Sequence, residues 1–179
     1  MKKEVAIYKA SLDNEELNQI RSVLESKDDL SKVLEFEESI KNFVGAKHAV
    51  ATATSTAAIH LALSAIKLKR GDKILMSVNS FVNLPECVRH FDAEPVFIDI
   101  NMEDMNIDVD KFEKALEENN SKKLRGAIIT FVGGQTPDLD RIYDIAQKYG
   151  IILIEDCRSS LGATYKGKTV GNLRADMTI

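Results

Sequence analysis

Three short segments of the chain carry side chains that could bind a ligand with a phosphate group and a planar ring. The first is the small, hydroxyl-rich stretch 51–58, which leads into a predicted helix. Backbone N–H groups at a helix N-terminus bind phosphate, and small side chains let the phosphate approach. Ser55, Thr56 and Ala57 are therefore candidates for a phosphate site. Capping of the helix by Ser or Thr explains the same stretch, and for the stretch alone it is the favoured interpretation.

The second and third segments each follow an apolar run. Phe81 comes just after a run that ends near Val78, and an aromatic ring there could stack on a planar ligand. Asp156 ends the run that begins at Ile151, where a carboxylate could hold a protonated ring nitrogen of a cofactor. Each has a plainer alternative: a buried Phe without a ligand, and an Asp that caps the next helix.

The elements that must position these segments alternate between short apolar runs and amphipathic helices. We predict strands at 49–52, 73–78, 95–100, 127–132 and 151–155, and helices at about 55–68, 83–91, 109–119 and 139–149. Strands this uniformly apolar are buried on both faces, so the sheet should be mostly parallel with helices on each side, in the α/β class. Ligands bind beyond the carboxyl ends of the strands in such a sheet, which is where the three segments fall.

The two ends of the chain add further elements. Asp13 and Glu16 form a capping-box pair before a first helix, and Gly45 stands where a second helix should end. We divide the chain into an N-terminal helical segment, 1–32, and a main domain, 33–179. Residues 163–170 alternate around Lys166-Gly167 like a hairpin, and residues 176–179 read as the opening of another strand, so the chain is expected to stop inside an element.

Composition narrows the function classes. The chain has 179 residues, 44% of them hydrophobic, and a net charge of −4 without basic blocks, which makes it a poor candidate for nucleic-acid binding. There is no apolar leader and no run long enough to span a bilayer, so a cytoplasmic protein is expected. Cys87 and Cys157 are interpreted as reduced core thiols. The scattered histidines, His48, His60 and His90, suggest no metal site, and His60 is interpreted as a packed residue.

Several common catalytic motifs are missing from the sequence. No GxGxxG follows the first predicted strand, and there is no GxxxxGK[ST], HExxH or GxSxG. The order and spacing of nine other blocks resemble the DegT/DnrJ/StrS family of sugar aminotransferases, which depend on pyridoxal 5′-phosphate (PLP). These blocks are 36–50, 54–63, Gly71-Asp72, 80–82, 93–99, 106–108, Gly134-Gln135, 154–156 and 160–171.

The resemblance implies a fold and a cofactor site. The fold would be the large domain of a fold-type-I aminotransferase, a three-layer α/β/α structure with a mostly parallel sheet. Thr56 and Ala57, next to Ser55, would bind the PLP phosphate, Phe81 would stack on the pyridine ring, and Asp156 would hold its nitrogen. The family has Gln or His near the cofactor's phenolic oxygen, and Ser159 stands at that position.

Four further positions depart from the family pattern. Ser55 replaces a Gly, Ser77 a usual Pro, and Asn79 and Asn83 replace apolar or small residues. The family's Schiff-base lysine is expected beyond residue 179. No catalytic residue is therefore assigned in this chain, and the chain alone is expected to be inactive.

The resemblance also implies a reaction and partners. The enzyme would transfer an amino group from an amino acid, with glutamate as the expected donor, to a nucleotide-linked keto-sugar in surface-polysaccharide or deoxyaminosugar biosynthesis. A homodimer is implied as well. Two alternatives stay open: a PLP-dependent deoxysugar dehydratase of the same family, in which His replaces the lysine, and a truncated, non-catalytic remnant that acts as a binding module.

Overall fold

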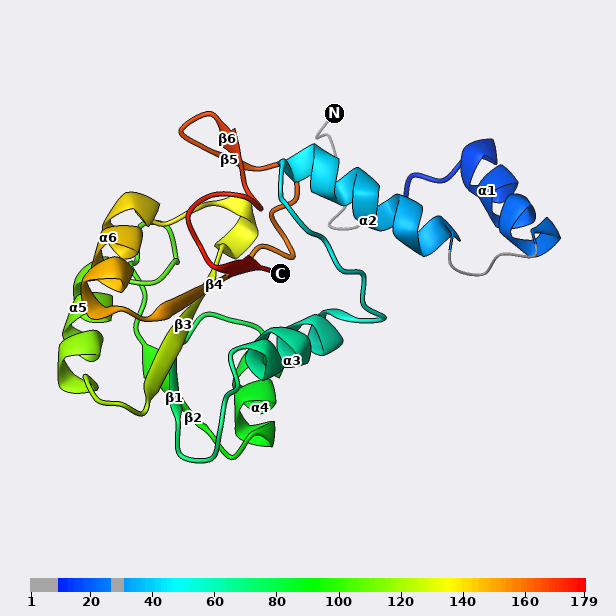
Figure 1. Cartoon of the computed structure of the whole chain (residues 1–179). Coiled ribbons are helices and arrows are strands. Elements are labelled where there is room, and N and C mark those ends of the chain that lie inside the picture. Colours follow the sequence, from blue (N-terminus) through cyan, green and yellow to red (C-terminus); the bar gives the residue numbers. More distant parts are fainter. Residues whose placement is uncertain (1–9, 27–30) are drawn as a thin grey trace.

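A parallel sheet forms the centre of the molecule. The computed structural model describes residues 10–26 and 31–179. Five strands pair in the order β2-β1-β3-β4-β7, and every pairing is parallel (Figure 1). Their bounds are β1 (Lys73–Ser77), β2 (Glu94–Ile98), β3 (Leu124–Thr130), β4 (Ile152–Asp156) and β7 (Met177–Thr178). The mostly parallel sheet predicted from the apolar runs is confirmed.

Helices cover both faces of this sheet. On one face lie α3 (Ser55–Ala65) and α4 (Asn83–His90), and on the other lie α5 (Val109–Glu118) and α6 (Leu139–Tyr149). The side chains of β1 explain the division. Ile74 and Met76 join the core under α3 and α4, whereas Leu75 joins the core under α5 and α6. All three are fully buried, as alternation on a strand packed on both faces requires.

One predicted strand is wrong. Residues 49–52 form no strand, although four of the five predicted apolar runs do. The stretch has no ladder partner among the described residues; instead, the N–H of Ala51 donates to the Glu37 carboxylate at 2.8 Å. Val50 is 68% exposed, so its β-branched side chain has no sheet face to pack against.

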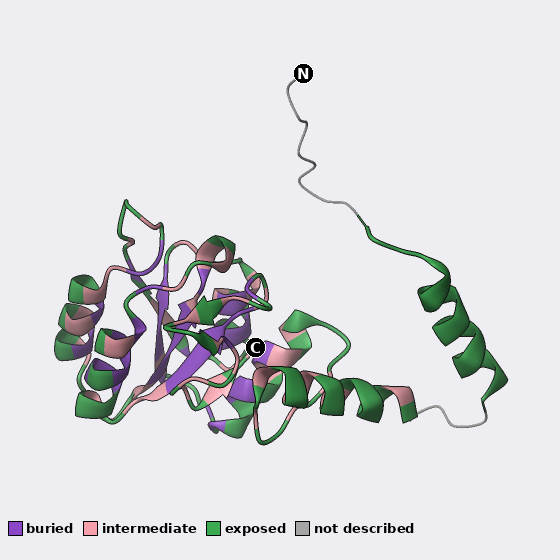
Figure 2. Cartoon of the chain, turned by 90° about the horizontal axis from the view of Figure 1, so that it is seen from above, coloured by how far each residue is buried: buried purple, intermediate pink, exposed green. Residues whose placement is uncertain are grey.

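The N-terminal helices lie outside the three layers. In α1 (Asn14–Glu25) the capping box of Asp13 and Glu16 is present, and no residue is buried (Figure 2). The helix α2 (Ser31–Val44) ends before Gly45, whose φ of 74° confirms the predicted glycine stop. The prediction that 1–32 and 33–179 are separate units stays a prediction.

Two contacts attach the end of α2 to the C-terminal part of the chain. The Asn172 side-chain amide donates to the Gly45 carbonyl at 2.5 Å. Gly171, at φ 116°, lies against Val44 so closely that an added Cβ would come within 2.9 Å of a Val44 methyl carbon. Only a residue without a side chain fits between these segments.

The predicted hairpin and the predicted final strand are both present. A short hairpin pairs β5 (Thr164–Tyr165) with β6 (Lys168–Thr169), and Lys166 and Gly167 turn it with positive φ values of 48° and 79°. The predicted final strand is β7, which pairs with β4. Among the described residues, no helix has the length and apolar character needed to cross a membrane.

Candidate functional site

A cavity of about 450 Å³ opens beyond the carboxyl ends of the central strands. It lies past β1, β3 and β4, at the edge of a parallel sheet where ligands are expected. Three residues predicted from sequence, Phe81, Asp156 and Ser159, are brought together in its wall. The full lining is Asn79, Ser80, Phe81, Thr130, Val132, Gly133, Asp156, Arg158 and Ser159.

Asp156 is the anionic centre of this wall. It is the last residue of β4, and only 3% of its surface is exposed. Arg158 holds it with two parallel hydrogen bonds, from Nε to Oδ1 at 2.5 Å and from Nη2 to Oδ2 at 2.8 Å. The Thr130 hydroxyl adds a third bond to Oδ2 at 3.2 Å. Such a bidentate ion pair fixes both side chains and neutralises the buried carboxylate.

Arg158 also reaches two helix N-termini. Its Nη1 donates to Ser55 Oγ at the start of α3 and to Asn83 Oδ1 at the start of α4, both at 3.2 Å. The Asn83 amide in turn donates to Thr56 Oγ1 at 3.1 Å. The pKa of Arg158 is raised above its ordinary value, chiefly because Asp156 accepts its hydrogen bonds. One guanidinium therefore links three segments that are far apart in the sequence.

The predicted phosphate segment lies beside this network. Ser55 and Ala57 are exposed, and Thr56 is half-buried, in the first turn of α3. The Ala57 N–H donates to Thr54 Oγ1 at 3.1 Å, which is the capping bond expected of the plainer interpretation. Ser55 and Thr56 face the network through their hydroxyl groups. The phosphate role of the three residues stays a prediction.

The remaining predicted residues differ in how they are held. Phe81 is 66% exposed, so it is not the buried Phe of the plainer alternative, and its ring is available to a ligand in the cavity. The Ser159 hydroxyl donates to the Phe131 carbonyl at 3.3 Å. Asp156 does not cap a helix, since a turn and the hairpin follow it. The geometry thus leaves Phe81 and Asp156 as groups that face the cavity.

Two site residues were missed in the sequence. Arg158 carried a signal, because a charged side chain stands two residues after Asp156 in an otherwise uncharged turn. Asn106 is fully buried and bridges the loop after β3: its Oδ1 accepts from the Val132 N–H at 3.0 Å, and its Nδ2 donates to the Gln135 carbonyl at 3.1 Å. Asn106 belongs to one of the blocks that carry the family resemblance, but nothing local indicates its burial.

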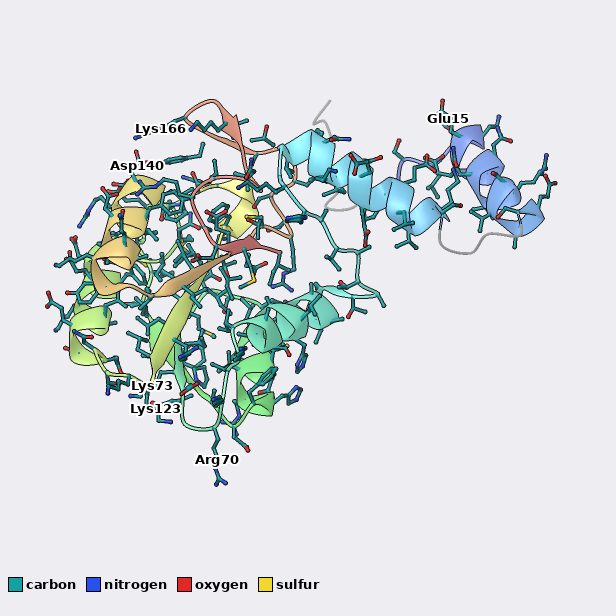
Figure 3. The ribbon with its side chains drawn as sticks, in the orientation of Figure 1. Glu15, Arg70, Lys73, Lys123, Asp140 and Lys166 are labelled. Atoms are coloured by element: carbon teal, nitrogen blue, oxygen red, sulfur yellow. The ribbon has the colours of Figure 1, made fainter. Side chains whose placement is uncertain are left out.

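Lys166, in the turn of the hairpin, is engaged outside the cavity. Lys166 forms an ion pair with Asp140 at the start of α6, and Figure 3 shows the two side chains beside each other. No lysine is found among the described residues that line the cavity. Figure 3 also places Arg70, Lys73 and Lys123 near the opposite, amino-terminal edge of the sheet.

Glu155, next to Asp156, points into the protein interior. It is fully buried, and it accepts hydrogen bonds from the Tyr143 hydroxyl and, at 3.4 Å, from Thr178 Oγ1. Burial raises the pKa of the Glu155 carboxyl above its ordinary value, and the pKa of Tyr143 is raised mainly by burial too. The hydrogen bond from Thr178 to Glu155 helps to anchor β7 beside β4, because Thr178 lies in β7 and Glu155 lies in β4.

The cysteines and histidines lie outside the lining. Cys87 and Cys157 are free and buried, as predicted, and burial raises the pKa of each thiol. The view that the histidines are scattered needs correction, because His60 and His90 stack with ring centres 5.1 Å apart and ring nitrogens 3.0 Å apart. The two histidines meet because α3 and α4 pack side by side. This contact is not evident from the sequence, where His60 and His90 are far apart. No cluster of three or more metal-binding side chains occurs in the described part of the chain.

Comparison with known proteins decides the family. The DegT/DnrJ/EryC1/StrS aminotransferase family matches residues 10–179. The chain belongs to this family. The family resemblance seen in the sequence blocks is thereby confirmed, and the α/β fold agrees with it.

Two curated members of the DegT/DnrJ/EryC1/StrS family show the range of relatives. The spore coat polysaccharide biosynthesis protein SpsC of Bacillus subtilis is 35% identical over 164 residues, which are 90% of this chain and 41% of that protein. The UDP-4-amino-4,6-dideoxy-N-acetyl-beta-L-altrosamine transaminase of Campylobacter jejuni is 38% identical over 149 residues, 83% of this chain and 38% of that protein. The chain thus spans less than half the length of these relatives.

A solved structure shares the fold. GDP-4-keto-6-deoxymannose-3-dehydratase, with a trapped PLP-glutamate geminal diamine, superimposes with a TM-score of 0.85 at 25% identity. The match covers 95% of this chain and 45% of the dehydratase. The three-layer arrangement predicted for this chain therefore has a direct counterpart in a solved protein.

Proposed function

We propose that these 179 residues are the cofactor-binding, N-terminal part of a PLP-dependent sugar aminotransferase. The observation that carries the proposal is the cavity beyond the sheet, which gathers Phe81 and Asp156 beside the start of α3 in a chain of this family. When bound, PLP supplies the electron sink that allows a proton to leave the Cα of an amino donor.

The residues around the cavity fit such a cofactor. The first turn of α3 offers backbone N–H groups and small side chains to a phosphate. The exposed ring of Phe81 offers a face to a pyridine ring, and the Asp156 carboxylate marks the end where the ring nitrogen would lie. Ser159 would lie near the phenolic oxygen. In this arrangement the chain binds and orients the cofactor and shields one end of it from water.

The proton-transferring lysine is proposed to lie outside these residues. The described cavity lining contains no lysine, and Lys166 is engaged by Asp140 at the start of α6. We therefore expect the 179-residue chain to bind PLP without catalysing transamination. A longer enzyme containing this sequence would supply the lysine.

The substrate and the setting are proposed from the relatives' names. The transaminase of Campylobacter jejuni is named for a UDP-linked amino sugar, and SpsC is named for coat polysaccharide biosynthesis. We propose that the complete enzyme transfers an amino group from glutamate to a nucleotide-linked keto-sugar, in the cytoplasm and as a homodimer. A deoxysugar dehydratase is the second candidate, because the solved dehydratase shares the fold at 25% identity.

Binding of PLP to the purified chain tests the proposal. Titration should give saturable binding of one PLP per chain, detected by the difference absorbance of the ring and by retention on dialysis. Pyridoxal, which lacks the phosphate, should bind much more weakly. The absence of saturable PLP binding would overturn the proposal. Assaying the longer enzyme with glutamate and nucleotide-linked keto-sugars then separates amino transfer from dehydration.

A further inference from the structure

The amino-terminal edge of the sheet, opposite the cavity, carries cations that the proposed function does not use. Three segments meet there: residues 66–73 lead from α3 into β1, residues 91–94 lead from α4 into β2, and residues 119–125 lead from α5 into β3. Figure 3 shows Arg70, Lys73 and Lys123 at this edge. We call the three segments together the basic edge, and its cations are Lys67, Lys69, Arg70, Lys73, Lys122, Lys123 and Arg125.

Hydrogen bonds hold the three segments of the basic edge against one another. The Gly71 N–H donates to the Asp92 carbonyl at 2.8 Å, which joins the first segment to the second. The Lys73 N–H donates to the Lys123 carbonyl at 2.7 Å, and Lys123 Nζ donates to the Arg70 carbonyl at 3.4 Å. These bonds join the first segment to the third, so the cations share one surface that is fixed to the sheet.

The basic edge is positive although the chain as a whole is negative. Its seven cations stand against three carboxylates, those of Asp72, Asp92 and Glu94. The cations exceed the carboxylates by four, and the net charge of the whole chain is −4, so the rest of the chain carries a net charge of −8. The molecule is therefore strongly polarised in charge, with its positive end at this edge.

Four cations of the basic edge have no carboxylate partner. Asp72 is only 6% exposed, and it forms ion pairs with Lys123 at 3.6 Å and Arg125 at 3.9 Å. Glu94 forms an ion pair with Lys73 at 3.7 Å. The other four cations are all exposed, and none forms an ion pair within residues 10–26 and 31–179; these free cations are Lys67, Lys69, Arg70 and Lys122.

The chemistry of the basic edge fits a broad anionic surface better than a nucleic acid. Its one aromatic side chain, Phe91, packs against the core, so the edge has no ring on which a base could stack. The free cations lie in turns and loops, whereas a helix or β-ribbon is the element that enters the major groove of DNA. Three of the four are lysines, which act as point charges on flexible stems and need no fixed partner geometry.

We propose that the basic edge docks on the anionic lipid headgroups of a membrane surface. Each Lys or Arg at such a surface strengthens binding about fivefold. The rest of the chain, with its net charge of −8, is repelled by the same headgroups, so binding favours the orientation in which the basic edge faces the bilayer. The cavity, at the opposite end of the strands, then faces away from the bilayer and stays open to soluble ligands.

Sedimentation of the full 179-residue chain with lipid vesicles tests the proposal. At low ionic strength the chain should sediment with vesicles of equal parts phosphatidylcholine and phosphatidylglycerol, and not with vesicles of phosphatidylcholine alone. Binding should be lost at about 1 M salt, where charges are screened beyond about 3 Å. A chain that does not sediment with the anionic vesicles at low ionic strength would overturn the proposal.

Two triple variants separate the basic edge from the net charge of the chain. The edge variant combines Lys69→Gln, Arg70→Gln and Lys122→Gln, and it should bind the anionic vesicles about 100-fold more weakly. The control variant removes three exposed cations that have no ion pair in the described part of the chain and lie outside the basic edge; it combines Arg21→Gln, Lys47→Gln and Lys168→Gln. The control should bind almost as the wild type does, and equal losses in the two variants would contradict the proposal.

Further measurements separate this proposal from folding, from nucleic-acid binding and from the PLP site. Because all six substituted side chains are exposed, both variants should unfold at the wild-type urea concentration. Tighter binding to duplex DNA than to anionic vesicles at equal phosphate concentration, with its loss in the edge variant, would overturn the proposal in favour of nucleic acid. PLP binding should be the same in both variants, and a chain that binds vesicles but no PLP would overturn only the proposed function.

Discussion

At the scale of single residues, Phe81 can be changed with little effect on the core. Its side chain is 66% exposed on the cavity wall. We expect Phe81→Ala to weaken PLP binding by about 0.5–1.5 kcal/mol, or about two- to tenfold in Kd, because ring stacking is lost. Phe97→Ala is the matched control, since Phe97 is 53% exposed on β2 and does not line the cavity. Equal effects of the two substitutions on Kd would contradict the role of Phe81.

Glu155 should make stability depend on pH. Its raised pKa means that the folded chain binds the carboxyl proton more tightly than the unfolded chain does. Its contribution to the free energy of unfolding is therefore present below the ordinary pKa of 4.5 and is lost as the pH rises through the raised value. Urea unfolding should show that Glu155→Gln flattens the decline in the free energy of unfolding as the pH rises above 4.5.

A matched control for this experiment is Glu117→Gln. Glu117 also accepts a hydrogen bond from a tyrosine hydroxyl, that of Tyr149, at 3.2 Å, but it is exposed. Burial is the main cause of the raised pKa of Glu155, so this control removes a tyrosine–carboxylate hydrogen bond without removing a buried carboxyl group. The same flattening in both variants would show that burial of Glu155 is not the cause.

At the scale of elements, the loop after β3 depends on one buried amide. Asn106 accepts from the Val132 N–H and donates to the Gln135 carbonyl, and Val132 and Gly133 line the cavity. Asn106→Ala leaves these backbone groups without their partner, so we expect a loss of about 1–3 kcal/mol in the free energy of unfolding, together with weaker PLP binding. Asn101→Ala, which removes an exposed bond to the Glu103 N–H, should cost much less.

Hydrophobic periodicity predicted those helices and strands whose local sequence alone specifies them. The runs that became β1 to β4 are apolar on both faces, and α5 and α6 begin at Asp caps as expected, so each could be predicted from local sequence. Residues 49–52 have the composition of a strand, but a strand also needs a partner, which local sequence does not reveal.

In the candidate site, too, some residues could be predicted from local sequence and others could not. Phe81 and Asp156 were predicted because each follows an apolar run, and the topology of the sheet then brings them to one cavity. The links among Arg158, Ser55 and Asn83 depend on side chains that meet across three segments. Likewise, the contact between His60 and His90 depends on helix packing. Contacts of this kind are set by tertiary structure, so residue types and spacing in one sequence do not specify them.

At the scale of the whole molecule, Gly171 determines how α2 meets the rest of the chain. We expect Gly171→Ala to lower the free energy of unfolding by about 2–4 kcal/mol, since the new Cβ would collide with Val44 at a strained φ of 116°. Proteases should then cut more readily in residues 45–54, the connection after α2. Gly167→Ala is the control for strain alone, because Gly167 has a φ of 79° and no atom within 4 Å of the added Cβ. Equal losses would mean that the contact with Val44 contributes nothing.

The strand order has a consequence for how the chain folds as it leaves the ribosome. Although β1 is the first strand to be made, it lies inside the sheet between β2 and β3 (Figure 1). After β2 ends at Ile98, residues 99–130 must be synthesised before β3 can cover the other edge of β1, which takes about 2–6 s at cellular translation rates. During that interval the apolar strand Lys73–Ser77 presents an open edge to any neighbouring nascent chain. Chaperone capture of ribosome-bound chains should therefore peak after β2 emerges and fall once β3 has emerged.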